Sequence, residues 1–175
     1  HIQNLDKAKR DPKMIEDDIA RGRRHFAWCC KLYRQQVSCW ADSLHEHPDS
    51  ATSWAERRVR EVLALRGAGR VTADQCQFDQ EDTHRGPVRK PTGCMSNAPE
   101  LLRILSVRCM GRSGACSHRR GGRHAACLGT TARRAAIFQD ELCTAIPQGL
   151  KRQLVKDGIM KHNEVGISMH EDGDD

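Results

Sequence analysis

The chain has 175 residues, and its 29 Lys and Arg exceed its 23 Asp and Glu, for a formal net charge of +6. Leu, Ile, Val and Phe make up less than a fifth of it, which predicts a small core and segments that do not order by themselves. No run approaches about 18 apolar residues, which excludes a membrane span, and no secretory signal is visible. We therefore expect an intracellular protein of the cytoplasm or nucleus that is not secreted. Because His1 comes first, we also expect a fragment of a longer chain.

In chain order, a helix is predicted first, over residues 12–35. Asp11 and Pro12 are typical of a helix start, and apolar residues then recur at helical spacing. A short strand is predicted over 37–44, ended by the His-Glu-His-Pro sequence at 45–48.

A second helix is predicted from Ser53 to Gly67, because Ser53 and Glu56 have the spacing of a capping box. A strand is predicted over 70–78, where apolar side chains alternate between the two sides.

Residues 79–95 are charged and interrupted by prolines, which predicts a loop. Asn97 indicates the start of a third helix. The Gly-, Arg-, Cys- and His-rich segment 111–129 predicts a loop that needs outside help to order. A helix is predicted over 131–146, with Pro147 interrupting it before a further helical segment.

These elements predict a helix-rich α/β or α+β fold with a small sheet, loop-rich and partly disordered. We expect a disordered lead over 1–11, a single domain over 12–158 with a basic Cys/His loop at 108–130, and a polar, acidic, disordered tail over 159–175.

The chain has nine cysteines, and without a secretory signal their odd number favours free thiols or metal ligands over a disulfide framework. Zinc is bound by four Cys and His side chains, which a Gly-rich loop can supply. The candidate ligands are Cys109, Cys116, His124 and Cys127. Cys76 or Cys143 could also supply a ligand through the fold. Because no Cys-x-x-Cys pair occurs, the alternative is a basic loop whose thiols have no shared role.

Segment 108–134 contains seven arginines and no acidic residue. Arginine suits phosphate, and a flexible basic segment is typical of contact with a DNA or RNA backbone without base reading. The residues expected to make this contact are Lys90, Arg112, Arg119, Arg120, Arg123, Arg133 and Arg134. The alternative is a solvated charged loop, since no aromatic stacking partner is nearby.

His45, Glu46 and His47 form a weaker candidate site. In an extended chain the imidazoles lie on one side and the carboxylate on the other, where Glu46 could act as a general acid or bind a substrate. The alternative is a polar strand end broken by Pro48. Phosphate-binding, nucleophile-elbow, metalloprotease and dinucleotide-binding motifs are absent.

Several short blocks follow one another along the chain. They are LHEHP at 44–48, ATSW at 51–54, DQCQF at 74–78, RKPTGCMSN at 89–97, RCMG at 108–111, AAIF at 135–138 and ELCTAI at 141–146. Their order, over roughly residues 12–160, resembles an uncharacterised segment of copia-like retroelement (retrotransposon) polyproteins from protists. The resemblance implies a DNA integration context, with nucleic acid and other regions of the same polyprotein as partners. No polymerase or protease motif of such polyproteins occurs here.

The chain is more distantly similar to the C-terminal part of cytosine-5 DNA methyltransferase-like proteins. This similarity implies an incomplete Rossmann-like (methylase-like) half-fold, in which Glu46 matches a base-contacting glutamate and Cys76 and residues 90–92 match later blocks. The Pro-Cys nucleophile motif and the S-adenosylmethionine loop are missing.

We therefore expect a non-catalytic, nucleic-acid-associated segment of a retrotransposon polyprotein, with zinc as its only cofactor. One alternative is part of a base-directed methyltransferase-like enzyme that another polyprotein region completes, with Glu46 as the working residue. A third is a decayed element without function.

Overall fold

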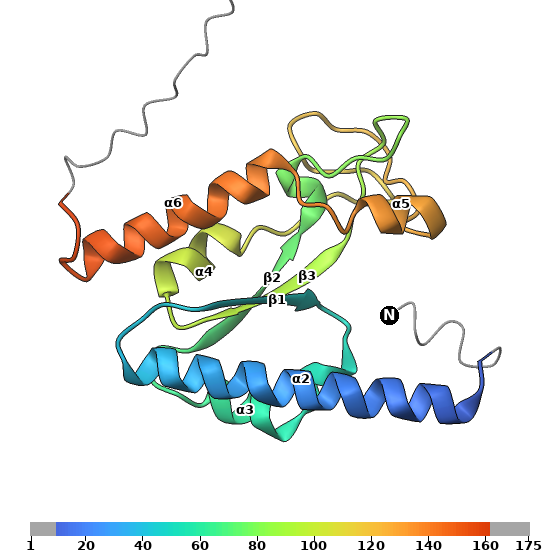
Figure 1. The fold of residues 1–175 in the computed structure, drawn as a ribbon. Coiled ribbons are helices and arrows are strands. Elements are labelled where there is room, and N and C mark those ends of the chain that lie inside the picture. Colours follow the sequence, from blue (N-terminus) through green and yellow to red (C-terminus); the bar gives the residue numbers. More distant parts are fainter. Residues whose placement is uncertain (1–9, 162–175) are drawn as a thin grey trace, which may run out of the picture.

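A three-stranded antiparallel sheet lies between two layers of helices (Figure 1). The structure, a computed structural model, describes residues 10–161. Strand β3 (Pro91–Ser96) is central, with β1 (Leu44–Pro48) on one side and β2 (Gly69–Asp74) on the other. The expected helix-rich fold with a small sheet is thus confirmed.

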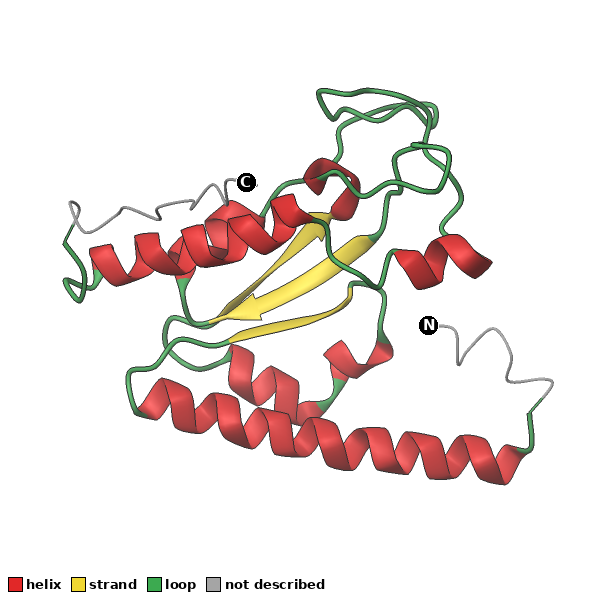
Figure 2. Cartoon of the chain, turned by 45° about the horizontal axis from the view of Figure 1, so that its top comes forward, coloured by secondary structure: helices red, strands yellow, loops and turns green. Residues whose placement is uncertain are grey.

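Helices cover both faces of the sheet (Figures 1 and 2). Helices α2 (Pro12–Ser38) and α3 (Arg57–Leu63) lie on one face, and α4 (Pro99–Leu105) and α6 (Asp140–Lys156) on the other. The short α5 (Gly129–Arg134) precedes α6, so the helix predicted over 131–146 is in fact two helices.

Helix α2 begins where the sequence predicts. The Asp11 carboxylate accepts a hydrogen bond from the backbone N–H of Lys13 at 2.8 Å, and Pro12 opens the first turn. The helix continues to Ser38, so the strand predicted over 37–44 is wrong. The strand β1 instead runs through the His-Glu-His-Pro sequence. Pro48 is tolerated because it lies at the end of an edge strand, where no backbone N–H is needed for pairing.

Neither predicted helix cap at Ser53 or Asn97 forms. Ser53 belongs to the 3-10 helix η2 (Thr52–Ala55), and α3 begins only after Glu56, without a side-chain cap. The Asn97 side chain instead accepts hydrogen bonds from the backbone N–H and hydroxyl of Ser43, both at 2.8 Å. This tertiary contact joins the residue before β1 to the residue after β3.

The loop predicted over 79–95 is wrong at its end, because Pro91 opens the central strand. A proline at the first position of a strand forfeits little pairing. Gly93 is required by packing, since a Cβ there would lie 2.7 Å from Cζ2 of Trp54. Pro91 and Gly93 suggest a loop by themselves, but they are the residues that let this strand fit under the indole ring of Trp54.

Two cores cover the two faces. One joins the sheet to α4 and α6, and its buried members include Cys94, Leu101, Leu105 and Leu142. Helix α6 passes Pro147 without the predicted interruption. Close packing on α4 holds this part of α6 in place, since a Cβ at Gly149 would lie 2.8 Å from Cα of Leu101. The second core joins the sheet to α2 and α3. Its buried members are Cys30, Trp54, Val59, Val62 and Met95.

The Rossmann-like half-fold is not confirmed. Doubly wound sheets are mostly parallel, whereas β1 and β2 both pair with β3 in the antiparallel sense. The expected disordered lead and tail fall largely on residues 1–9 and 162–175, outside the described residues. Between residues 10 and 161, no helix is long and apolar enough to cross a membrane.

Candidate metal centre

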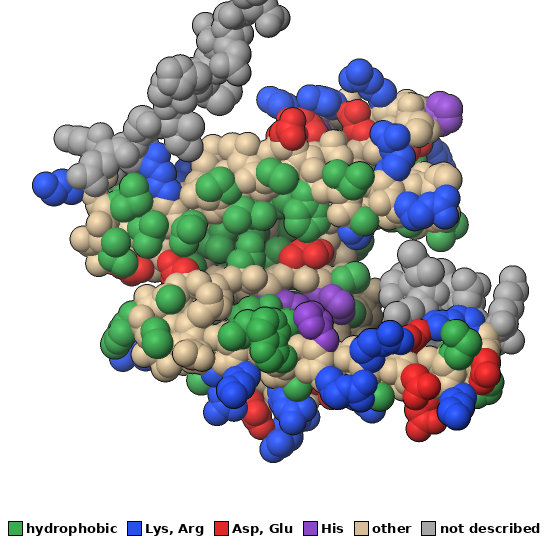
Figure 3. All heavy atoms as spheres, viewed as in Figure 1, with side chains coloured by type: hydrophobic (Ala, Val, Ile, Leu, Met, Phe, Trp, Pro, Cys, Tyr) green, Lys and Arg blue, Asp and Glu red, His purple; other side chains and the backbone are tan. Residues whose placement is uncertain are grey.

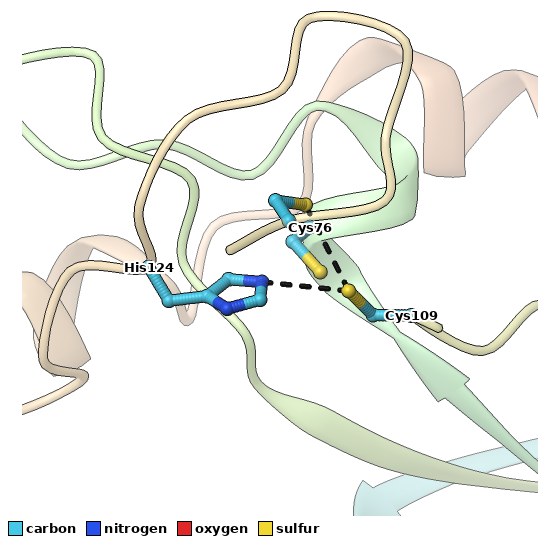
Figure 4. A group of neighbouring side chains, drawn as sticks. Cys76, Cys109 and His124 are labelled. Carbon is cyan, nitrogen blue, oxygen red and sulfur yellow. Dashed lines mark hydrogen bonds between the residues drawn. The ribbon is translucent and has the colours of Figure 1, made fainter. Parts of the chain in front are cut away.

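Four potential metal ligands from separate parts of the chain converge beyond the end of β2 (Figure 4). Cys76 lies on the 3-10 helix η3 (Gln75–Phe78), directly after β2, and Cys109 follows α4. Cys116 and His124 come from the Gly- and Arg-rich loop. One ligand atom from each residue lies within 4.8 Å of all the others.

The distances within this Cys3His cluster suit one tetrahedral ion. With zinc–sulfur bonds of about 2.3 Å, two sulfurs of a tetrahedron lie about 3.8 Å apart, and a sulfur and a nitrogen about 3.6 Å. The Sγ atoms of Cys109 and Cys116 lie 3.9 Å apart, and Cys109 Sγ lies 3.5 Å from His124 Nε2. The ligand set and spacing fit zinc.

Hydrogen-bond donors surround the sulfurs, as expected for thiolates that bind a metal. The backbone N–H of Ser117 donates to Cys109 Sγ at 3.4 Å, its hydroxyl lies 3.5 Å from the same sulfur, and Gln77 donates to Cys116 Sγ at 3.6 Å. Burial by itself would raise the pKa of Cys109, but these Ser117 contacts lower that pKa to about 6. Burial raises the pKa of Cys76 to about 12, so a metal would have to displace that proton.

The strand end holds the start of the loop in place. Asp74, the last residue of β2, is fully buried, and its carboxylate accepts a hydrogen bond from the backbone N–H of Cys109 at 2.9 Å. Arg108 Nε donates to the same oxygen at 3.0 Å. Two residues after Cys109 the chain turns so tightly that a Cβ at Gly111 would lie 2.0 Å from the carbonyl oxygen of Ala115. Only glycine fits there.

Three of the four ligands predicted from sequence lie in the cluster, and the fourth does not. Cys127 lies outside the cluster, and so does the exposed Cys143. Cys76 takes the fourth place, one of the two alternatives that the sequence left open. Because Cys76 is 33 positions before Cys109, no local spacing could select it over Cys127.

Acidic side chains from another segment neutralise part of the basic loop. Arg120 forms ion pairs with Asp79 at 2.9 Å and with Glu81 at 3.3 Å, and Arg119 lies 4.0 Å from Asp79. His118 lies 3.2 Å from the same carboxylate. These acidic partners lie outside segment 108–134, so the composition of that segment does not reveal them.

The other basic residues fall into two groups. Four of the arginines expected to contact phosphate are exposed and form no ion pair within residues 10–161. They are Arg112, Arg123, Arg133 and Arg134. Lys90, in contrast, donates from Nζ to the carbonyl oxygen of Ala135 at 2.8 Å, which ties β3 to the end of α5. Lys90 therefore makes a structural contact, and it is less exposed than those arginines.

Glu46 lies apart from the metal ligands, in the middle of β1 and opposite Cys94. Burial raises the pKa of its carboxyl, which the charge of Lys90 partly offsets. On the other side of β1, His45 Nδ1 lies 2.9 Å from the Tyr33 hydroxyl, in a group of aromatic rings. The ring centre of His47 lies 5.8 Å from that of Phe26, so both histidines pack beneath α2.

On the face drawn in Figure 3, Lys and Arg side chains lie over the loop, along α2 and α3, and near the end of α6. The chain therefore combines a buried Cys3His cluster with a basic loop above it. In comparisons with known proteins, no protein-family model, no curated protein and no solved structure matches this chain.

Proposed function

We propose that this chain is a non-catalytic, nucleic-acid-associated segment of a retroelement polyprotein, in which zinc folds a basic loop that contacts phosphate. The observation that carries the proposal is the convergence of Cys76, Cys109, Cys116 and His124 at the base of that loop. A zinc ion would be a structural ion here, because four protein ligands leave no open position for a substrate.

Zinc would join the loop to the strands. Cys76 is attached to β2, whereas Cys116 and His124 belong to a segment with few apolar side chains. Binding of one ion to all three residues would contribute the folding energy that this segment lacks. The loop would then present Arg112 and Arg123 in fixed positions.

Contact with phosphate follows from the charge and chemistry of this surface. Guanidinium groups bind phosphate oxygens, and such contacts carry no sequence information. Asp79 and Glu81 hold Arg120 at 2.9 and 3.3 Å, whereas Arg119 reaches Asp79 only at 4.0 Å. Arg112, Arg119 and Arg123, which are exposed, are therefore better placed to meet a backbone.

The retroelement origin is supported by the order of the sequence blocks, with other regions of the same polyprotein as further partners. The distant methyltransferase similarity is supported by the same kind of evidence and by the half-buried Glu46, while its Rossmann-like half-fold is proposed from the sequence blocks alone. Since the nucleophile motif is missing, we propose a role without catalysis.

Binding of a fluorescent 20-base-pair DNA duplex to the zinc-loaded chain tests the function. Replacing Arg112, Arg119 and Arg123 by Ala should weaken binding and reduce the slope of log affinity against log salt by about 2 to 3. The control, in which the exposed residues Arg66, Arg103 and Arg152 become Ala, loses the same charge elsewhere. Equal loss in both variants would show a general charge effect and contradict the proposal.

A further inference from the structure

Helix α2 exposes an unusual aromatic side chain on its outer face. The Trp28 side chain is 58% exposed, although tryptophan is largely buried in most proteins. Its ring lies 6.3 Å from that of His25, with 26° between the two planes. The inner face of α2 instead carries Phe26 and Cys30, which pack on the second core. Trp28 therefore has no role in that core.

Cations surround this ring. Residues 19–38 of α2 include five Lys and Arg and no acid. Arg21, Arg24 and Lys31 lie seven, four and three positions from Trp28, which places them on the same side of the helix. Arg24 and Lys31 are exposed and form no ion pair among the described residues, while Arg21 is paired with Asp18.

The remaining two cations of this segment point toward α3. Arg23 pairs with Glu56 at 3.0 Å, and Arg34 pairs with Glu61 at 3.3 Å. Between residues 19 and 38 of α2, the cations without an ion pair thus lie on the side that carries Trp28. We name the set of Arg21, Arg24, His25, Trp28 and Lys31 the α2 outer face.

An exposed aromatic ring between unpaired cations matches one kind of partner. Bases of a single strand can stack on a tryptophan while their phosphates meet Lys and Arg, whereas bases of a duplex are stacked on each other. Arg24 and Lys31 are separated by about 10 Å along the helix, so one base can lie on Trp28 between them. Charge complementarity thus favours nucleic acid, and the free ring favours its single-stranded form.

We propose that the α2 outer face binds single-stranded DNA or RNA by stacking a base on Trp28, with phosphates held by Arg24 and Lys31. This inference rests on the proposed function in taking nucleic acid as the partner, but it uses a separate surface. The basic loop and α2 lie on opposite sides of the sheet (Figures 1 and 2). The loop would hold any backbone, while α2 would select unpaired bases.

A fluorescein-labelled 12-mer of oligothymidylate and a duplex of the same length test this inference in anisotropy titrations with the full chain. Trp28→Ala should weaken single-strand binding about tenfold and leave duplex binding unchanged. Trp28→Phe keeps a stacking ring and should restore most of the affinity. Trp40→Ala is the matched control, because Trp40 is 92% exposed but lies just beyond the end of α2. Thermal melts should show that all three variants fold.

The outcomes separate the two surfaces. If Trp28→Ala binds the 12-mer like the unchanged chain, the inference is overturned, whatever the loop variant does. If Trp28→Ala weakens binding while the loop variant has no effect, the inference holds and the proposed function of the loop fails. A chain that is dimeric in sedimentation, and monomeric only as Trp28→Ala, would assign this face to a second copy and overturn the inference.

Discussion

Cys76→Ser is the sharpest test of the metal centre, because tertiary structure alone selects Cys76 as a ligand. The side chain is 1% exposed, and its sulfur belongs to a group within 4.8 Å of three other ligand atoms. Serine is close in size but supplies no thiolate. Cys127→Ser is the matched control, since Cys127 lies outside the cluster in the same basic loop.

The size of the effect follows from linkage. A ligand that binds only the folded chain at 1,000 times its Kd stabilises it by about 4 kcal/mol. For a chain of this length, each kcal/mol raises Tm by about 2–4 °C. Zinc should therefore raise Tm by about 8–16 °C in the unchanged chain and in Cys127→Ser, but by only a few degrees in Cys76→Ser.

The assay is thermal unfolding of the reduced protein, followed by circular dichroism with zinc and again with excess chelator. Titration calorimetry should give one zinc per chain. The assignment of Cys76 as a zinc ligand is refuted if Cys127→Ser loses the zinc-dependent rise and Cys76→Ser keeps it, or if zinc does not change the Tm of the unchanged chain.

Three further predictions concern the pH dependence of stability, the turn at Gly111 and the hydrophobic core. Burial lowers the pKa of His45 to about 4 from an ordinary 6.5. Between these pH values the unfolded state binds more protons than the folded state, so the free energy of unfolding should fall as pH falls through this window. His45→Leu should reduce the difference between the urea midpoints at pH 7 and pH 4.5. Gly111→Ala should weaken zinc binding about tenfold or more in calorimetry, since its Cβ would meet the Ala115 carbonyl. Gly22→Ala is the control: with open space around residue 22, this variant should bind zinc normally and be slightly more stable. Leu105→Ala, at a fully buried site, should cost about 2–5 kcal/mol in urea unfolding without changing zinc stoichiometry, and a smaller loss would contradict its place in the core.

Local chemistry was sufficient to predict parts of the fold. The start of α2 depends on Asp11 and Pro12, which act within one turn of the chain. The Gly- and Arg-rich segment is irregular because it has no apolar period, so neither helix nor strand could bury a face there. Three members of the Cys3His cluster were predicted for a related reason, since Cys109, Cys116 and His124 occur close together in the sequence.

Other features depend on residues that are distant in sequence. Pro91 and Gly93 suggest a loop by themselves, and they form a central strand only because β1, β2 and the Trp54 ring lie around them. The charge of the loop is reduced by Asp79 and Glu81, which precede it by about 30 residues or more.

The sequence by itself therefore determined the class of the fold, the irregular basic loop and the chemistry of its ligands, because these follow from composition and from neighbours along the chain. Only the tertiary structure decided that Cys76 rather than Cys127 completes the cluster and that Trp28 stands exposed among unpaired cations. The physical reason is that a metal site and a binding surface are defined by distances of a few ångströms, and packing of the helices on the sheet fixes those distances.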